Sequence, residues 1–182
     1  YGTQRDEVVR LDYDGTLTTL HSFYSPSDPS PVLNPALVLG SDGALYGTTP
    51  SGGASGAGTI FRIDSAGNFT SLHSLVLYTE GYSPGALALG SDGALYGTAG
   101  GNVSGPYGTI FRIDSAGTFT SLHSFQSFEG SCTCAALKLG SDGALYGTSA
   151  TGGYMFGTVF RIDSAGTYTE LHRFYDLTDG RN

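Results

Sequence analysis

Short apolar segments alternate with polar, glycine-containing turns along the chain. In one fifty-residue stretch the apolar segments are 36–39, 44–48, 58–64 and 69–74. Segments of this length are typical of β-strands and are too short for stable helices. A Ser-Asp-Gly turn separates the first two segments and a Ser-Ala-Gly turn the last two. Because such turns between apolar segments favour hairpins, the pattern predicts four short antiparallel strands.

The four-strand pattern repeats with a period of about fifty residues. The nine residues Gly-Ser-Asp-Gly-Ala-Leu-Tyr-Gly-Thr occur without a change at 40–48, 90–98 and 140–148. A second block, Phe-Arg-Ile-Asp-Ser-Ala-Gly, keeps the same spacing and has a degenerate copy at 9–15. Units of this kind bury their faces against their neighbours. We therefore expect an all-β fold, a β-propeller of four-stranded antiparallel blades, with a linear stack of hairpins as the rival architecture.

The repeats indicate one β-propeller domain over residues 1–182. Its repeats cover about 1–30 (partial), 31–80, 81–130 and 131–182. The first strand of the unit is missing from the first repeat, which would leave one blade incomplete and one strand edge unpaired. Three explanations remain open: a longer natural chain, a strand supplied by a neighbouring copy, or a four-blade ring that closes imperfectly. We expect self-association in preference to an isolated monomer.

Charge and hydropathy exclude two classes of partner. The formal net charge is −8 with only 8 Lys and Arg residues, whereas nucleic-acid binding depends on clustered cations. We expect no nucleic-acid partner. No apolar run approaches the roughly 18 residues of a membrane span, so we expect no membrane insertion. The sequence predicts no cofactor and no metal site.

The repeat unit also resembles a known family. The pattern P-x-A-L-x-L-G-S-D-G-x-L-Y-G-T, then a Gly-rich loop, G-T-[IV]-F-R-I-D-x-x-G and L-H-S-F, is similar to the Gloeobacter and Verrucomicrobia tandem repeat, often called the GloVer repeat. The resemblance covers nearly the whole chain. It implies an extracellular or cell-surface bacterial protein without a defined activity. The strand order resembles that of NHL-type propellers, in which the first strand of each blade lies nearest the axis.

Variation between the repeats concentrates in two sets of loops, those after the second and the fourth strand. In an up-and-down blade both sets emerge on the face opposite the two short turns, and such loops commonly carry function. We call this face the loop face. Aromatic rings beside acidic groups can stack on sugars or anchor a protein interface, although they can also simply pack the loops together. The candidate binding residues are Tyr24, Tyr78, Glu80, Tyr82, Tyr107, Phe128, Glu129, Tyr154 and Phe156.

The remaining candidates are assigned structural roles. A histidine recurs on the fourth strand of each repeat, at 21, 73, 123 and 172, and should bond a neighbouring strand or blade. Arg62 and Asp64 lie two apart and so share one strand face, which predicts a ladder of charge-assisted bonds with the Asp capping the next turn.

The sequence leaves two kinds of modification open, cysteine pairing and N-glycosylation. Cys132 and Cys134 could form a local disulfide, pair between subunits or stay reduced. Asn68 and Asn102 fit the acceptor pattern for N-glycosylation.

Nearly unchanged turns and one variable face favour a non-catalytic protein. The sequence therefore predicts a structural, adhesion or assembly module that binds other surface proteins, copies of itself or glycans through the loop face, with no catalytic residue. The alternative is a lectin-like propeller or a carbohydrate-active enzyme, a glycoside hydrolase or lyase, with Glu80 and Glu129 as its paired carboxylates.

Overall fold

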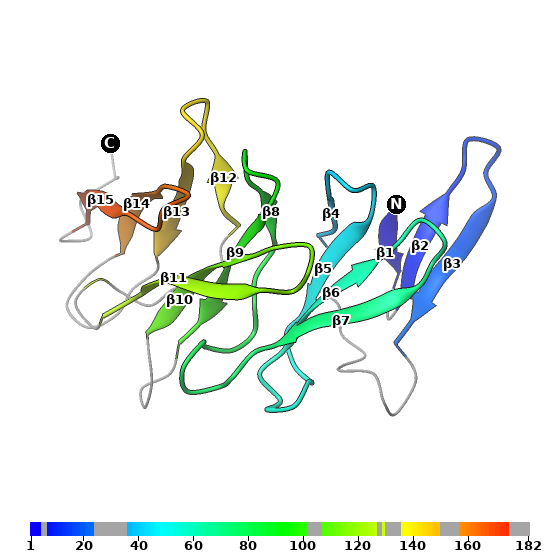
Figure 1. Ribbon diagram of the computed structural model, residues 1–182, viewed down its shortest axis with the longest axis horizontal. Helices are drawn as coiled ribbons and strands as arrows, with labels where there is room; N and C mark the ends of the chain where they lie inside the picture. The colour runs from blue at the N-terminus through cyan, green and yellow to red at the C-terminus, as the bar shows by residue number, and fades with distance from the viewer. Residues whose placement is uncertain are drawn as a thin grey trace.

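The computed structural model shows an all-β protein of four antiparallel sheets, which we number as blades 1 to 4 (Figure 1). The described residues are 1–4, 7–23, 36–101, 107–126, 129, 136–149 and 157–174. Within them there is no helix, so the strand content and the predicted absence of helix are confirmed. No helix in these ranges is long and apolar enough to cross a membrane.

Blade 1 has three strands and the other blades have four, each in chain order across its sheet. Blade 1 consists of β1 (Gly2–Gln4), β2 (Glu7–Leu11) and β3 (Leu17–Ser22). Blade 2 consists of β4 (Val38–Leu39), β5 (Leu45–Thr49), β6 (Thr59–Ile63) and β7 (Phe69–Ser74). Blade 3 consists of β8 (Ala88–Leu89), β9 (Leu95–Gly100), β10 (Gly108–Ile113) and β11 (Phe119–Ser124). Blade 4 consists of β12 (Lys138–Leu139), β13 (Leu145–Ser149), β14 (Thr158–Ile162) and β15 (Tyr168–Arg173).

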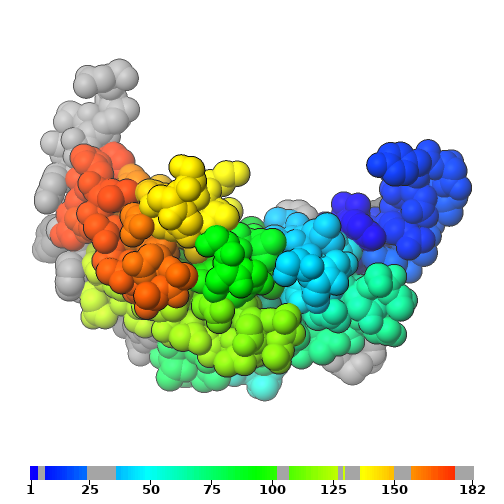
Figure 2. All heavy atoms as spheres, turned by 45° about the horizontal axis from the view of Figure 1, so that its top comes forward, coloured from blue at the N-terminus to red at the C-terminus, as the bar shows by residue number. Residues whose placement is uncertain are grey.

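The blades follow one another in an arc (Figure 2). The short first strands β4, β8 and β12 lie on its inner side, where β8 contacts both of the others. The predicted blade order, with the first strand innermost, is therefore the observed one. Figure 1 places the β4–β5, β8–β9 and β12–β13 turns toward one face, at the top of the view, and the described β5–β6 and β7–β8 loops toward the opposite face. We call the former the turn face.

The core of each four-stranded blade is built around a phenylalanine that packs on a glycine of the preceding strand. Phe111 on β10 is fully buried and lies opposite Gly97 on β9. A Cβ at Gly97 would lie 2.5 Å from Phe111 Cζ, so only glycine leaves room for this ring. The same pair recurs in the two other complete blades as Gly47 with Phe61 and Gly147 with Phe160. This packing explains why the Leu-Tyr-Gly-Thr segment is copied unchanged.

Stacked rings join each blade to the next. His21 of blade 1 stacks on Phe69 of blade 2, with ring centroids 4.1 Å apart. His73 stacks on Phe119 of blade 3 at 4.3 Å. His123 stacks on Tyr168 of blade 4 at 3.9 Å, with the two rings nearly parallel. The structural role predicted for these histidines is confirmed at all three blade junctions.

Candidate functional site

The Ser-Asp-Gly turn between β4 and β5 carries a fixed carboxylate. Oδ1 of Asp42 accepts a hydrogen bond from the Ala44 backbone N–H at 3.1 Å. Oδ2 accepts one from the Tyr46 hydroxyl at 3.0 Å. Arg62 on β6 donates to the same Oδ2 through Nε at 3.1 Å and Nη2 at 2.9 Å. A carboxylate oxygen has two lone-pair sites, so Oδ2 is crowded while Oδ1 retains accepting capacity.

These contacts determine the protonation states of Asp42 and Tyr46. Burial alone would raise the pKa of Asp42, but the hydrogen bonds from Arg62 and from the Ala44 N–H outweigh burial and hold it below its ordinary value. Burial raises the pKa of Tyr46, and the hydrogen bond to Asp42 adds to that rise. At neutral pH the turn therefore presents a neutralised ion pair and a protonated phenol.

The partner of the arginine differs from the sequence prediction. Arg62 pairs with Asp42, whereas Asp64 caps its own turn by accepting the Ala66 N–H at 2.9 Å and the Asn68 N–H at 2.8 Å. The predicted turn cap is confirmed, and the predicted ladder with Asp64 is wrong in blade 2. Asp42 is the partner of Arg62 because the β4–β5 turn brings its carboxylate within hydrogen-bond distance of the guanidinium. The described residues of blade 1 contain no Ser-Asp-Gly turn. There the arginine pairs with the Asp that follows its own strand, as Arg10 with Asp12 at 3.1 Å.

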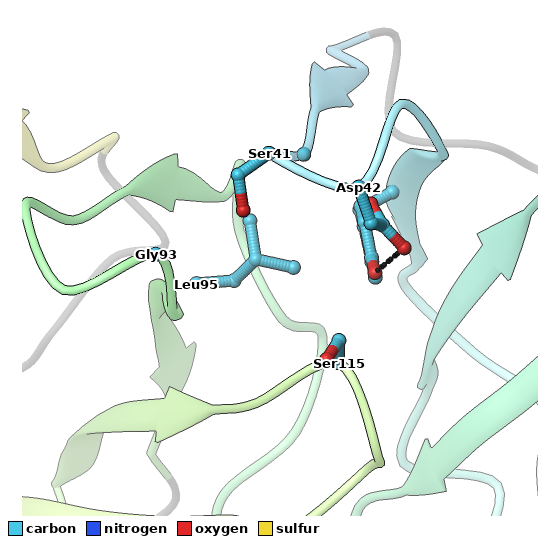
Figure 3. Close-up of a pocket in the computed structure, with 7 residues that line it drawn as sticks. Ser41, Asp42, Gly93, Leu95 and Ser115 are labelled. Atoms are coloured by element: carbon cyan, nitrogen blue, oxygen red, sulfur yellow. Dashed lines mark hydrogen bonds between the residues drawn. The ribbon is translucent and has the colours of Figure 1, made fainter.

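A pocket opens on the turn face between blades 2 and 3 (Figure 3). The pocket is shallow and small, lined by seven residues. Ser41 and Asp42 reach it from the β4–β5 turn, and Ser115 reaches it from the β10–β11 turn. Gly40, Tyr46, Gly93 and Leu95 complete the lining.

The lining chemistry suits a neutral ligand with several hydroxyl groups. Two serine hydroxyls can donate and accept, and Asp42 Oδ1 can accept a charge-assisted hydrogen bond. Arg62 neutralises the carboxylate, which removes the main attraction for a cation, and the described residues contain no cluster of three metal-ligating side chains. The leucine gives the pocket one apolar surface.

The predicted loop-face residues on the β7–β8 connection lie close together in the chain but have different surroundings. Tyr78 and Tyr82 are exposed, with 63% and 40% of their surface accessible. The Glu80 carboxylate is held by His73 Nε2 at 2.8 Å and by the Val76 N–H at 2.9 Å. Its bonds therefore shape its own loop, while the two tyrosines remain available for contacts.

Two more predicted residues are packed inside. Tyr107 is partly buried against the core of blades 3 and 4. Glu129 is buried and accepts hydrogen bonds from the Gln126 N–H at 2.7 Å and from His123 at 3.3 Å. Glu80 and Glu129 are thus each bonded within a separate loop. The other candidates, Tyr24, Phe128, Cys132, Cys134, Tyr154, Phe156 and Asn102, lie outside the described residues.

Sequence reasoning missed the turn-face pocket. It assigned the copied turns to the scaffold because copies that do not vary resemble structural parts. The available signal was Ser41, which is kept in every Gly-Ser-Asp-Gly copy. The β4–β5 and β8–β9 turns, which contribute to the pocket, and the described β7–β8 loop lie toward opposite faces of the arc (Figure 1).

Comparisons with known proteins place the fold. A family model described as "Gloeobacter/Verrucomicrobia repeat" matches residues 3–182. A sequence search of curated proteins gave no match. Solved structures with a similar fold include a gluconolactonase from Xanthomonas campestris, with TM-score 0.60 and 21% identity over 93% of this chain and 56% of that one.

Two further enzymes share the fold. One is a luciferin-regenerating enzyme, with TM-score 0.61 and 14% identity over 96% of this chain and 57% of that one. The other is a PQQ-bound aldose sugar dehydrogenase from Streptomyces coelicolor, with TM-score 0.57 and 15% identity over 91% of this chain and 58% of that one. The chain thus spans about half the length of these propellers, and the likeness shows the β-propeller fold.

This result corrects the expectation of a non-catalytic structural or adhesion module. Solved structures of similar fold include enzymes, so the findings favour the alternative of a carbohydrate-active protein over the main prediction. The error has a physical cause. The copied strand residues reflect blade packing, as at Gly97 and Phe111, and that packing is required whether or not one junction of the propeller carries chemistry.

Proposed function

The chain belongs to the Gloeobacter/Verrucomicrobia repeat family, and from that premise we propose that it is a carbohydrate-active β-propeller, part of an enzyme that acts on neutral sugars. The observation that carries the proposal is the turn-face pocket with its serine hydroxyls and neutralised carboxylate. The names of two of these propellers support the substrate class, since one is called a gluconolactonase and the other an aldose sugar dehydrogenase.

In this proposal the pocket residues bind and orient the sugar. Ser41, Ser115 and Asp42 Oδ1 take up its hydroxyl groups, and Leu95 contacts the apolar side of the ring. The lowered pKa of Asp42 keeps it ionised and the raised pKa of Tyr46 keeps it protonated. We therefore assign these two groups to binding and not to proton transfer, which needs a pKa near the working pH.

A second candidate function is lectin-like binding without turnover. One observation favours it: the Asp, Tyr and Arg arrangement recurs in blades 2, 3 and 4, as expected of repeated binding sites and not of a single reaction centre. An extracellular or cell-surface location and contact with glycans on other surfaces fit either candidate and stay predictions.

Turnover and binding measurements on one sugar panel test both candidates. The panel contains neutral monosaccharides, oligosaccharides and aldonolactones, with product release followed by chromatography and binding by calorimetry. We expect turnover of at least one class, lost in Ser115→Leu, which fills the pocket. Ser65→Leu is the matched control, because Ser65 has the same turn position in blade 2 and does not line the pocket. Binding without turnover would leave the lectin-like candidate, and absence of both would overturn the proposal.

A further inference from the structure

The turn-face pocket is built from residues that the repeat supplies again one blade later. The first pocket combines the Ser-Asp-Gly turn of blade 2 with the glycine, leucine and serine of blade 3. The junction of blades 3 and 4 offers the same set in the same order. Its residues are Gly90, Ser91, Asp92, Tyr96, Gly143, Leu145 and Ser164.

The carboxylate of the second set is held as the first one is. The Tyr96 hydroxyl donates to Asp92 Oδ2 at 3.1 Å, and the Ala94 N–H donates to Oδ1 at 3.1 Å. Arg112 completes the arrangement through Nε at 3.0 Å and Nη2 at 2.9 Å. Burial would raise the pKa of Asp92, but these hydrogen bonds hold it below its ordinary value, as for Asp42.

The gap between facing turns is also preserved. A Cβ at Gly93 would lie 3.5 Å from Ser41 Oγ, and a Cβ at Gly143 would lie 3.4 Å from Ser91 Oγ. Both glycines have positive φ, 77° and 78°, which side chains rarely adopt. The two blade junctions therefore have the same spacing and the same backbone, and no side chain at the glycine position enters either gap.

We propose that the chain carries two equivalent sites for one neutral sugar ring each, one between blades 2 and 3 and one between blades 3 and 4. This inference rests on the proposed sugar-binding role of the first pocket. A single ring is proposed as the ligand because each site has only two serine hydroxyls, one carboxylate and one leucine to contact it. Two sites on one rigid arc would let the protein bind two residues of one glycan, or two glycans, with a gain in avidity.

Blade 4 supplies an internal control. Its turn carries Asp142, which accepts from the Tyr146 hydroxyl at 3.1 Å and from Arg161 Nε at 3.1 Å. No described blade faces this turn, and the Asp142 side chain is 43% exposed against 34% for Asp42 and 31% for Asp92. Asp142 lines neither proposed site, although its neighbour Gly143 lines the second, so Asp142→Asn is a control for loss of the same ion pair at the first site.

Titration of the isotope-labelled protein with D-glucose, D-galactose and D-mannose, followed by amide NMR shifts, tests the inference. We expect shifts at both junctions, in Ser41, Gly93 and Ser115 and separately in Ser91, Gly143 and Ser164. Asp42→Asn should weaken binding about tenfold or more at the first set and leave the second unchanged. Asp92→Asn should weaken binding at the second set, and Asp142→Asn should leave binding at the first set unchanged.

The outcomes separate this inference from the proposed function. Shifts at the blade 2–3 junction alone would overturn the second site and leave the proposed function standing. Shifts at neither junction, or only on the loop face, would overturn both. A variant that fails to fold would be recognised from its amide spectrum, and Ser115→Leu for the first site with Ser164→Leu for the second would then replace it, since both serines are exposed turn residues.

Discussion

The same hairpin position has opposite surroundings in blade 1 and in blade 2. Leu11 ends β2 with 62% of its surface exposed, whereas Ile63 ends β6 fully buried. Leu17 on β3 is 54% exposed, but its counterpart Phe69 packs into the core formed with blade 1. The local sequence and hairpin are alike, so the difference comes from the preceding blade. A blade of this family is therefore not a complete folding unit, because one of its faces is buried only by its neighbour.

The largest expected effect is on the free energy of unfolding, when the residue that ends the strand before the second turn of a blade is truncated to alanine. Ile113, the blade 3 counterpart, is fully buried between blades 2 and 3. Ile113→Ala should lower the free energy of unfolding by about 2–5 kcal/mol, through lost transfer energy and a cavity. Leu11→Ala should change it by no more than about 0.5 kcal/mol, because the side chain is already solvated.

Urea denaturation of the two variants checks this prediction. Equal losses in both would contradict the comparison, because they would mean that Leu11 is covered in solution by a surface that the described residues do not provide. A loss in Ile113→Ala alone confirms that the neighbouring blade accounts for the burial.

A second contrast concerns the glycine before the strand threonine. A Cβ at Gly97 would lie 2.5 Å from Phe111 Cζ and 3.1 Å from Leu87 Cδ2, whereas a Cβ at Gly2, the blade 1 counterpart, would meet nothing within 4 Å. Gly97→Ala should therefore cost about 1–3 kcal/mol by overpacking. Gly2→Ala should be nearly neutral, and thermal melts of the pair measure the difference. A neutral Gly97→Ala would show that the ring can move aside and would remove the reason given for the repeated glycine.

The sequence was sufficient for the blades because their signals are local. The period, the Asp-Gly turns and the segment lengths predicted the strands of blade 2 to within about two residues, for example 69–74 for β7. It was insufficient wherever a residue's role depends on a distant partner. Arg62 shares a strand face with Asp64, but it pairs with Asp42 twenty positions earlier, and only the folded turn brings the two together.

The candidate site was hidden for a related reason. Its residues come from the first hairpin of one blade and both hairpins of the next, so no segment of the sequence contains the pocket. The loop-face residues, in contrast, could be chosen from variation alone. Glu80 shows the limit of that method, since the carboxylate chosen for chemistry forms its hydrogen bonds to His73 and to the backbone of its own loop.

The smallest expected effect is on the loss of stability in acid. It distinguishes blade 2 from blade 1, because the described residues of blade 1 lack the Ser-Asp-Gly turn. The folded protein holds the pKa of Asp42 below the ordinary value of about 3.9. Between the two pKa values the unfolded chain binds more protons, so the stabilisation is present above the unfolded pKa and is lost as the pH falls through the folded one.

Asp42→Asn should therefore be less stable than the wild type at pH 7 and lose less stability on acidification below about pH 4. Ser41→Ala, in the same turn, leaves the carboxylate in place and should keep the wild-type slope of unfolding free energy against pH. Parallel curves for Asp42→Asn and the wild type would mean that the Arg62 ion pair contributes nothing to the acid sensitivity of the fold.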